Sequence, residues 1–506
     1  MKAVFTSQRT ATLAALLAGA LTVAGFAPIG AIPLPFLTLA GLLALWRRAP
    51  SPRDGLRTGF AFGAGLFGTG VSWVYVSLHD YGLMPAPLAA VATLLFCVVL
   101  ALYPAAAGWC FVRLRPERGV AALFAFASLW TLSEWLRGWL LTGFPWLAVG
   151  YTQTDTPLAG FAPVLGVFGV SFATALCSGL LNLVFSGSGR VRIASVAALL
   201  LALGLGALLQ QISWTSPRGE PFRVALLQGN IPQELKFQAE RYTATLATYR
   251  RLIAGSSAQL IVLPETAIPR FLDAVDAHYL NDIAQLARER RADLVIGVPV
   301  RDQGGRYFNS VVSIGVSPTQ RYDKLHLVPF GEFVPPGFGW IVKTLSIPLS
   351  DFTSGPQNPR PLALSGQWVA PDICFEDTFG EEIVRQLPQA TLLVNLSNIA
   401  WFGDSLAPAQ HLQISRMRAI ETGRFMLRAT NTGVTAIIDP RGKVVARLPQ
   451  FTEGALQGEV RGHAGASPYV RFGNTPIVLA CLALLALLAA LAHHRRRAVG
   501  LARESR

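Results

Sequence analysis

Residues 369–377 read VAPDICFED, an apolar run that ends at Cys374 with acidic residues on both sides. The run has the length and composition of a buried β-strand, so it places the thiol at a strand end. Two other segments read as strands that end at an ionisable side chain: LIVLPE at 260–265 leads to Glu265, and RYDKLH at 321–326 contains Lys324. A thiol, a carboxylate and an ammonium are the groups that an acyl-transfer site needs.

The composition is typical of a membrane protein. Of the 506 residues, 52% are hydrophobic and 14% are charged, whereas soluble proteins carry about 25% charged residues. The apolar excess lies in two regions, and the stretch between them has ordinary soluble composition. The sequence therefore predicts a membrane-spanning bundle over 1–212, a polar domain over 213–473, a last span over 474–494 and a basic cytoplasmic tail over 495–506.

The net charge of +14 does not indicate a nucleic-acid partner, although strongly basic chains often have one. The arginines lie mainly beside the apolar segments, where they set the orientation of a membrane protein. The sequence therefore predicts no nucleic-acid binding.

Eight segments are long and apolar enough to be interpreted as membrane-spanning helices, which need about 20 residues. They are 9–27, 31–46, 56–78, 86–112, 119–140, 160–186, 191–212 and 474–494. The second is short and begins among prolines. The first resembles a signal peptide, but further spans follow it at once, and we interpret it as a retained anchor.

Lysine and arginine in the short loops predict the orientation. They precede the first span and follow the second, fourth, sixth and eighth, while the alternate loops hold almost none. This alternation predicts that both termini are cytoplasmic and that 213–473 lies on the outer face. In a bacterium, this is a multi-pass protein of the inner membrane with a periplasmic polar domain.

The five cysteines favour Cys374 as a nucleophile. The other four lie in apolar spans, where a cysteine is ordinarily a small buried hydrophobe. No C-x-x-C pair indicates a metal, and a lone thiol in the polar domain has no disulfide partner. The sequence therefore predicts no metal site.

The polar domain reads as alternating strands and helices, which predicts a layered α/β fold. Strand-like runs are 222–227, 260–263, 294–298, 310–316, 368–373, 391–396, 426–430 and 434–438; helix-like runs are 238–254, 273–291, 379–387 and 407–424. Nucleotide, zinc and serine-hydrolase motifs are missing from the sequence.

Three features leave alternatives open. The long Pro- and Gly-rich stretch 334–361 carries Trp340 and other apolar residues, and it is either an interfacial lid or a loop that packs over the domain. Aromatic residues in the outer loops form an interfacial belt or a lipid-binding rim. Glu134 and Arg137, three residues apart, either snorkel to water or orient a lipid headgroup.

The three strand-end residues suggest a division of labour. Glu265 can take the thiol proton and hand it to a leaving group. Lys324 can lower the thiol pKa and stabilise an oxyanion. His326 shares a strand face with Lys324, so spacing alone leaves it as another candidate base.

These motifs resemble the Glu-Lys-Cys signature of the nitrilase superfamily. The matching stretches are LPE at 263–265, Lys324 with GEF at 331–333, and ICFE at 373–376. A domain of this kind between membrane spans resembles the apolipoprotein N-acyltransferases, as do QGNIPQ at 228–233 and NLSNIAWFGD at 395–404.

The resemblance implies a four-layer αββα sandwich over 213–473, with Glu265 as general base, Lys324 as transition-state stabiliser and Cys374 as nucleophile. It gives supporting roles to Glu332, Phe375 and Glu376. The candidate substrate-binding residues are Phe237, Trp340, Asn398 and Trp401. At 237 and 375 this chain has Phe where the family often has Trp and Tyr, which keeps the ring and removes a polar atom.

The resemblance also implies the reaction. A phospholipid, phosphatidylethanolamine in this family, gives its sn-1 acyl chain to Cys374. The N-terminal amine of a diacylglyceryl apolipoprotein then takes the chain from the thioester, without nucleotide, metal or other cofactor. This is ping-pong chemistry with one covalent intermediate.

Three rivals remain at the level of sequence. A membrane-tethered amidase or nitrilase would use the same residues with water as acceptor. A transporter would carry ionisable groups in mid-span, and these spans are nearly free of them. A third possibility moves an acyl chain within the lipoprotein itself.

Overall fold

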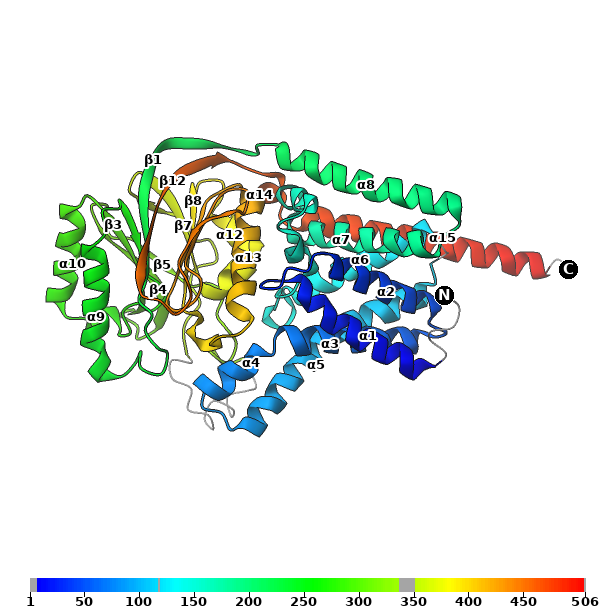
Figure 1. The fold of residues 1–506 in the computed structure, drawn as a ribbon, viewed down its shortest axis with the longest axis horizontal. Coiled ribbons are helices and arrows are strands. Elements are labelled where there is room, and N and C mark those ends of the chain that lie inside the picture. The colour runs from blue at the N-terminus through cyan, green and yellow to red at the C-terminus, as the bar shows by residue number, and fades with distance from the viewer. Residues whose placement is uncertain (1–6, 117–118, 336–350, 505–506) are drawn as a thin grey trace. The chain divides into compact units, whose positions relative to one another are not determined.

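The computed structural model describes residues 7–116, 119–335 and 351–504, with side chains described as far as residue 494. The chain folds as two compact units (Figure 1). The first comprises Met1–Ser72, Ala90–Ile212 and Phe472–Arg506, and the second comprises Trp73–Ala89 and Ser213–Arg471. The second unit thus includes a short segment that precedes the polar domain by more than a hundred residues.

The first unit is helical. Its helices are α1 (Gln8–Thr22), α2 (Pro33–Arg48), α3 (Pro52–Gly70), α5 (Ala86–Leu114), α6 (Val120–Arg137), α7 (Ala162–Ser186), α8 (Gly189–Gln211) and α15 (Thr475–Glu504). Helix α5 begins in the second unit and continues into the first. Each of the eight predicted segments overlaps one of these helices.

The prediction of eight spans is not confirmed. Within the described residues, four helices are long and apolar enough to cross a membrane: Ala86–Leu114, Pro157–Ser186, Gly189–Gln211 and Thr475–His494. A fifth span is possible if the bent pair Pro52–Gly70 and Trp73–Tyr81 counts as one. The helices α1 and α2 have 15 and 16 residues, which is below the length of about 20 that a span ordinarily needs.

Small residues bring α1 and α3 close together. A Cβ atom at Gly19 would lie 1.9 Å from the carbonyl oxygen of Phe62, and one at Gly65 would lie 2.0 Å from that of Leu16. Close approach at small residues is the usual way in which helices pack in a membrane, because lipid supplies no hydrophobic drive between them.

Glu134 and Arg137 are buried within the first unit, so neither extends to water. The Glu134 carboxylate accepts hydrogen bonds from the Trp130 indole and the Val149 backbone, both at 2.9 Å. The Arg137 guanidinium donates to the carbonyl of Trp146. The pair therefore holds the loop after α6, and the structure gives no support to the snorkelling interpretation.

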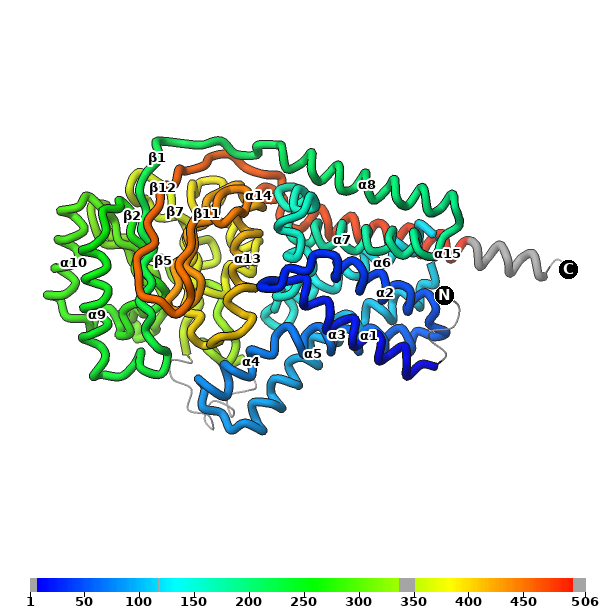
Figure 2. Tube along the Cα trace, viewed as in Figure 1, coloured from blue at the N-terminus to red at the C-terminus, as the bar shows by residue number. Residues whose placement is uncertain are grey.

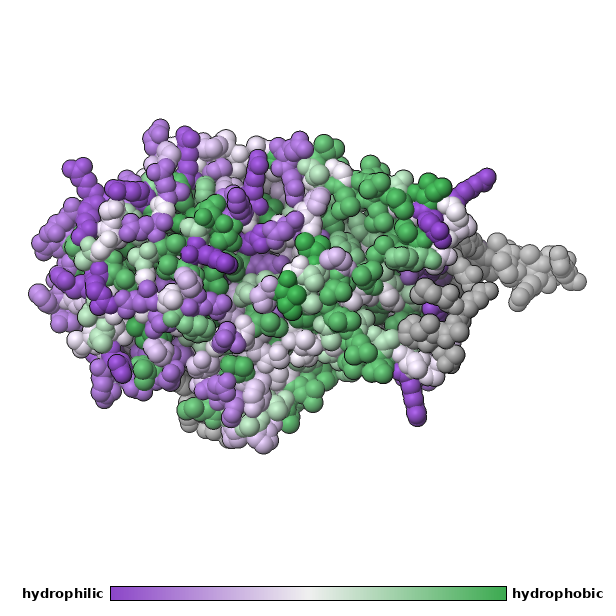
Figure 3. Space-filling model, in the orientation of Figure 1, coloured by the Kyte–Doolittle hydropathy of each residue, from purple (hydrophilic) through white to green (hydrophobic). Residues whose placement is uncertain are grey.

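On the face drawn in Figure 3, hydrophobic residues predominate over the first unit and hydrophilic residues over the second. On α8, Leu200 and Leu201 are 65% and 73% exposed, and on α5 Leu94 is 63% exposed. Apolar surface of this extent is normally covered by lipid or by a partner.

The second unit contains two mixed six-stranded sheets. The first has the order β12-β1-β2-β3-β4-β5, with β1 (Thr215–Gln228), β2 (Leu260–Val262), β3 (Asp293–Arg301), β4 (Tyr307–Gly315), β5 (Arg321–Asp323) and β12 (Gly454–Gly465). The second has the order β11-β10-β9-β8-β7-β6, with β6 (Leu362–Leu364), β7 (Gln367–Ile373), β8 (Leu392–Ser397), β9 (Met426–Thr430), β10 (Ala436–Ile438) and β11 (Val444–Arg447). In each sheet three central strands run parallel.

Three hydrophobic clusters define four layers. One lies between the sheets and includes Val262 and Leu396. A second lies between the first sheet and the helices α9 (Ala239–Ala254) and α10 (Ala277–Glu289). A third lies between the second sheet and the helices α12 (Gly380–Ile383) and α13 (Ala407–Thr422). The described part of the domain therefore confirms the layered α/β prediction, in the order helix, sheet, sheet, helix.

Of the longest strand pair, the sequence predicted β1 in part and did not predict β12. Strand β12 pairs with β1 along its whole length, from Gly465 opposite Thr215 to Gly454 opposite Gln228, and the two run side by side in Figure 2. β12 reads GALQGEVRGHAG, and its glycines and charges conceal the two-residue period of a strand.

Gly297 in β3 fits under the backbone that carries Glu265, and we predict that Gly297→Ala destabilises the domain. A Cβ atom there would lie 2.4 Å from the Pro264 carbonyl oxygen and 2.6 Å from the Glu265 Cα atom. Overpacking of this kind costs about 1–3 kcal/mol. The thermal unfolding midpoint in detergent should fall by several degrees.

Gly255→Ala is the matched control for this substitution. A Cβ atom at Gly255 would meet only ordinary contacts, at 3.5 Å and 3.7 Å. An equal midpoint for the two variants would contradict the close approach at Gly297.

Candidate active site

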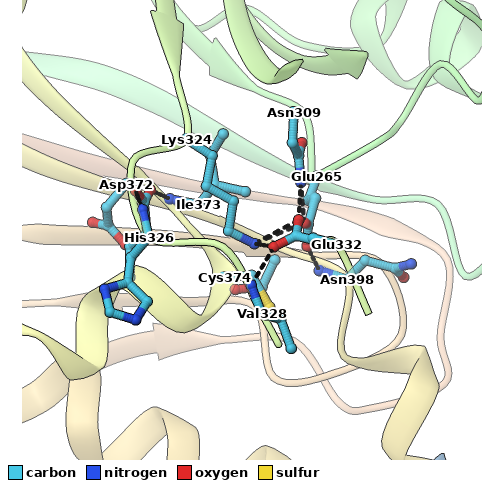
Figure 4. A network of polar contacts seen from close by, with 12 residues as sticks. Glu265, Asn309, Lys324, His326, Val328, Glu332, Asp372, Ile373, Cys374 and Asn398 are labelled. Carbon is cyan, nitrogen blue, oxygen red and sulfur yellow. Dashed lines mark hydrogen bonds and ion pairs between the residues drawn. The ribbon is translucent and has the colours of Figure 1, made fainter. Parts of the chain in front are cut away.

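The three predicted residues follow three strands, as their sequence contexts indicated. Glu265 lies three residues after β2, Lys324 directly after β5 and Cys374 directly after β7. β2 and β5 belong to one sheet and β7 to the other. Figure 4 shows the Lys324 side chain reaching between the carboxylates of Glu265 and Glu332, with Cys374 beside them.

The Lys324 ammonium is shared by two carboxylates. Its Nζ atom lies 2.9 Å from Glu332 and 3.6 Å from the Oε1 atom of Glu265. Lys324 is 1% exposed. A buried ammonium is stable only when paired, so the two carboxylates hold it in a fixed place.

Two asparagines orient Glu265. The Asn309 side-chain amide bridges the carboxylates, donating to Oε1 of Glu265 at 2.8 Å and to Oε1 of Glu332 at 2.7 Å. The backbone N–H of Asn398 donates to Oε2 of Glu265 at 2.8 Å. Both oxygens of Glu265 are therefore hydrogen-bonded, which fixes the plane of its carboxylate.

Glu332 is held in the same way. Besides Lys324 and Asn309, it accepts a hydrogen bond from the backbone N–H of Val328 at 2.8 Å. Glu332, to which the resemblance gave a supporting role, is therefore a direct partner of Lys324. Its carboxylate lies closer to the Lys324 ammonium than that of Glu265 does.

Cys374 adopts a left-handed backbone conformation, with φ of 55°. Such a conformation costs about 1–3 kcal/mol for a residue other than glycine and persists only where neighbours impose it. Here the Cys374 carbonyl accepts from the Asn395 amide and from Nε2 of His411, both at 3.1 Å. These contacts hold the sharp turn that presents the thiol.

A buried network supports this turn. Nε2 of His411 also donates to Asp377 at 2.6 Å, and Asp377 pairs with Arg428 at 3.3 Å. Because both partners of Nε2 are acceptors, the proton of the imidazole lies on that nitrogen. Burial lowers the pKa of His411, which favours the neutral ring.

Glu376 ties the Cys374 turn to the Lys324 strand end. Its carboxylate accepts from the backbone N–H groups of Ile373 and Leu325, both at 2.6 Å, and from the hydroxyl of Tyr322 at 2.9 Å. Burial raises the pKa of Glu376 to about 7, against the opposing effect of Lys324. This second expected supporting residue is therefore a structural link between the two sheets.

The electrostatics of the thiol are dominated by burial. Burial raises the pKa of Cys374, the charge of Glu265 raises it further, and Lys324 acts in the opposite direction. Burial alone would lower the pKa of Lys324, but Glu332 and Glu265 outweigh it and raise the pKa above its ordinary value. The resting site therefore holds a protonated thiol beside a permanently charged ammonium.

Comparison with known proteins places this chain in a family. The model of the apolipoprotein N-acyltransferase N-terminal domain matches residues 18–180, and that of the carbon-nitrogen hydrolases matches 223–469. The apolipoprotein N-acyltransferase of Nitrosomonas europaea is 51% identical over 95% of this chain and 97% of its own length. Those of Chromobacterium violaceum and Ralstonia nicotianae are each 48% identical, over 96% of this chain and 94% of their own lengths.

The chain belongs to the apolipoprotein N-acyltransferase family. The family resemblance carried by the sequence motifs is thereby confirmed. The match to the carbon-nitrogen hydrolases also confirms a nitrilase-like fold for the domain with the two mixed sheets.

In this member of the apolipoprotein N-acyltransferase family, His326 faces away from the charged group (Figure 4). Its Nδ1 atom lies 3.0 Å from Oε1 of Glu382, and its ring stacks on Phe379 at 3.5 Å between centroids. Its backbone N–H donates to Glu376. The position therefore gives His326 a structural role and no contact with Glu265.

The candidate substrate-binding residues of this apolipoprotein N-acyltransferase differ in exposure. Phe237 is 48% exposed, Trp401 is half-buried, and Asn398 is buried with its side chain donating to Gln233 at 2.8 Å. Trp340 lies outside the described residues, as do residues 336–350 of the predicted lid. Of the three candidates that the structure describes, Phe237 and Trp401 thus have side-chain surface available for a ligand.

Phe375 is half-buried and packs its ring against two others. The centroids of His326 and Phe379 lie 5.9 Å and 5.0 Å away. The ring thus helps to fix the turn that begins at Cys374.

The segment Trp73–Ala89 completes the turn after β8. The Trp73 ring packs edge-on against Phe402 at 4.6 Å, and its indole N–H donates to the Gln410 side chain at 3.2 Å. The turn Ile399–Phe402 directly follows Asn398, whose N–H holds Glu265. The sequence predicted either an interfacial belt or a lipid-binding rim for the outer-loop aromatic residues, Trp73 among them, and gave no sign of this contact.

Glu332→Gln should lower the pH at which the Cys374 thiol ionises, and Lys324→Met should raise it. A carboxylate disfavours a nearby thiolate and an ammonium favours it, in agreement with the directions found here. The check is the pH dependence of Cys374 alkylation by iodoacetamide, followed by peptide mass spectrometry in detergent. Midpoints that move in the same direction for the two variants would contradict the assigned charges.

Proposed function

We propose that this chain transfers an acyl chain from a phospholipid to the N-terminal amine of a diacylglyceryl apolipoprotein, through a thioester on Cys374. Membership of the apolipoprotein N-acyltransferase family supports the reaction. The observation that carries the residue assignment is the Lys324 ammonium, held between Glu265 and Glu332 and acting electrostatically on Cys374. We assign Glu265 as general base, Lys324 as transition-state stabiliser and Cys374 as nucleophile.

In the first half-reaction, the Cys374 sulfur attacks the carbonyl carbon of the sn-1 ester. Glu265 takes the thiol proton as the S–C bond forms. Lys324 and the backbone N–H of Phe375 stabilise the negative charge on the carbonyl oxygen. The ester C–O bond then breaks, the glycerol oxygen takes the proton from Glu265, and a lysophospholipid leaves the thioester behind.

In the second half-reaction, the neutral amine of the apolipoprotein attacks the thioester carbon. A carbon–nitrogen bond forms, and Glu265 accepts the proton that the amine loses. The C–S bond breaks, and the sulfur regains its proton from Glu265. A thioester is less stable than an amide, so this step runs downhill without nucleotide or metal. This is ping-pong chemistry.

We further propose the membrane arrangement. Eight spans, cytoplasmic termini and a periplasmic catalytic domain in the bacterial inner membrane agree with the distribution of lysine and arginine. Both substrates carry acyl chains, and each CH₂ group exposed to water costs about 0.8 kcal/mol. Phosphatidylethanolamine is the donor that the family resemblance favours, and Phe237, Trp340 and Trp401 are candidates for contact with the acyl chains.

A membrane-tethered carbon–nitrogen hydrolase is the second candidate. The match of residues 223–469 to the carbon-nitrogen hydrolases favours it, since the same three residues would serve with water as acceptor. The two candidates differ in their product, which is an acylated amine for the transferase and a free acid for the hydrolase.

Incubation of the purified protein with phosphatidylethanolamine should add the mass of one fatty acyl chain to the peptide that contains Cys374. Hydroxylamine should remove the adduct, because it cleaves thioesters. Cys374→Ala should show no adduct, and Cys481→Ala should retain it, since Cys481 is a buried thiol of α15. An acyl adduct that persists in Cys374→Ala would remove this residue from the mechanism.

The acyl-enzyme should discharge faster when a diacylglyceryl peptide is added than in buffer alone, and the acyl mass should appear on the peptide amine. Glu265→Gln should slow both half-reactions by roughly 10²–10⁴-fold, the usual contribution of a general base. Single-turnover mass spectrometry measures both rates. Discharge to free fatty acid at the same rate with and without peptide would favour the hydrolase.

A further inference from the structure

Lys236 is a buried lysine that the mechanism above does not use. It is 2% exposed, although its neighbours Phe237 and Gln238 are exposed. Its Nζ atom donates to the backbone carbonyl oxygen of Glu265 at 3.2 Å. The side chain thus ends at the residue that we assign as general base.

Lys236 makes no ion pair within the described part of the chain, and its one side-chain hydrogen bond goes to a neutral carbonyl. An ammonium can donate three hydrogen bonds, and a buried charge is costly unless it is compensated. The charges that act on it are those of Glu265 and Cys374. Its compensation therefore comes from the reacting groups themselves.

The net charge of the site indicates a role for Lys236. Glu265 and Glu332 supply two negative charges, and Lys324 supplies one positive charge between them. Without a second cation, the site would carry a net charge of −1 before any reaction. The tetrahedral adduct on Cys374 would then add a further negative charge in a buried place, where such charge is least stable.

The other charged groups near the sulfur do not supply this cation. Arg428 acts on Cys374, but it is paired with Asp377 at 3.3 Å. Glu376 acts on Lys324, but it is an acid and supplies no positive charge. Glu234 and Glu240 lie near Lys236 in the sequence, but they are exposed acids. Lys236 is thus the remaining cation among the described charges that act on the thiol and its base.

We propose that Lys236 is a second cation of the Cys374 site, whose ammonium stabilises the negative charge that builds on the sulfur and on the attacked carbonyl oxygen. The inference rests on the proposed function for its role in acyl transfer. It names a residue that neither the strand-end motifs nor the three assigned roles include.

The protonation state of Lys236 agrees with this role. Burial lowers its pKa to about 8, and the charges of Glu265 and Cys374 act in the opposite direction. The side chain is therefore mostly charged at neutral pH, and it loses its charge in mildly alkaline solution. Its effect should fade as the pH rises above about 8.

The local geometry holds Lys236 in this place. Gln233, three residues earlier, accepts a hydrogen bond from the Asn398 side chain at 2.8 Å, and the Asn398 backbone N–H donates to Glu265. The stretch from Gln233 to Lys236 is thus tied to Glu265 through two routes. A shift of the Lys236 chain would disturb both.

Three substitutions separate charge from hydrogen bonding. Lys236→Gln keeps a donor toward the Glu265 carbonyl and removes the charge, Lys236→Met removes both, and Lys236→Arg keeps both. The readout is the rate of Cys374 alkylation by iodoacetamide at pH 7, where Lys236 carries its charge, in the full-length protein without phospholipid or peptide. A nearby opposite charge shifts a pKa by about 1–3 units at short range.

We expect both Lys236→Gln and Lys236→Met to slow alkylation at pH 7 about threefold or more, and Lys236→Arg to stay near the parent protein. A wild-type rate in Lys236→Gln, or in both uncharged variants, would overturn the proposal. A change in Lys236→Met alone would show that only the hydrogen bond matters. Thermal unfolding in detergent identifies any variant that fails to fold.

A double variant tests the charge count directly. Lys236→Gln with Glu332→Gln leaves one carboxylate, Glu265, opposite one ammonium, Lys324. The alkylation rate at pH 7 should return toward that of the parent protein, because the net charge is again zero. A rate that stays at the Lys236→Gln value would overturn the charge argument, even if each single variant behaves as expected.

The alkylation measurement also separates this inference from the proposed function. It needs neither substrate, so it succeeds or fails whatever the acyl acceptor proves to be. If the proposed transfer also holds, Lys236→Gln should slow formation of the acyl-enzyme from phospholipid roughly tenfold and change KM little, since the charge acts on the transition state. An unchanged rate would limit Lys236 to the resting thiol.

Discussion

The pairing of one buried ammonium with two carboxylates is the constraint on which the candidate site depends. Lys324 is 1% exposed, and Glu265 and Glu332 are its charged neighbours within 4 Å in the described chain. Removing one partner of a buried ion pair costs about 3–5 kcal/mol, because the other is left uncompensated. The pairing therefore fixes three chain segments relative to one another before any substrate binds, and the thiol meets charges that are already in place.

The candidate site could be predicted from the sequence where the side chain follows an apolar strand. Glu265 and Cys374 do so, after β2 and β7, whose residues are buried along most of their length. Lys324 follows β5, which reads RYD, so its prediction depends on the resemblance to the Glu-Lys-Cys signature. Asn309 lies inside β4 and Lys236 follows no strand, so no preceding apolar strand marks either residue. For an asparagine inside a strand or a lysine in a polar stretch, the sequence does not indicate whether the side chain contacts an active-site residue or faces water.

For the fold as well, some elements could be predicted from the sequence and others could not. Central strands were predicted because hydrophobic residues repeat in them. Strand β12 was missed because its glycine-rich sequence has no such repeat, and pairing with β1 holds it in the sheet. The number of spans is not confirmed for the opposite reason. Apolar composition in 9–27 and 31–46 predicted spans, but the helices there end after 15 and 16 residues, and helix ends depend on local capping and turns that hydropathy does not record.

The Glu-Lys-Cys group alone does not decide between transfer and hydrolysis, since an amine and water attack a thioester in the same way. An N-terminal α-amine has an ordinary pKa of about 7.7–8.0, so a useful fraction is neutral at physiological pH and is a far better nucleophile than water. Water is nevertheless present in great excess wherever it has access. Selectivity must therefore come from the surroundings of Cys374, where the half-buried ring of Phe375 presents apolar surface. An acyl chain that covers such surface would keep water from the thioester and leave the polar side open to the amine, so the donor itself becomes part of the barrier to hydrolysis.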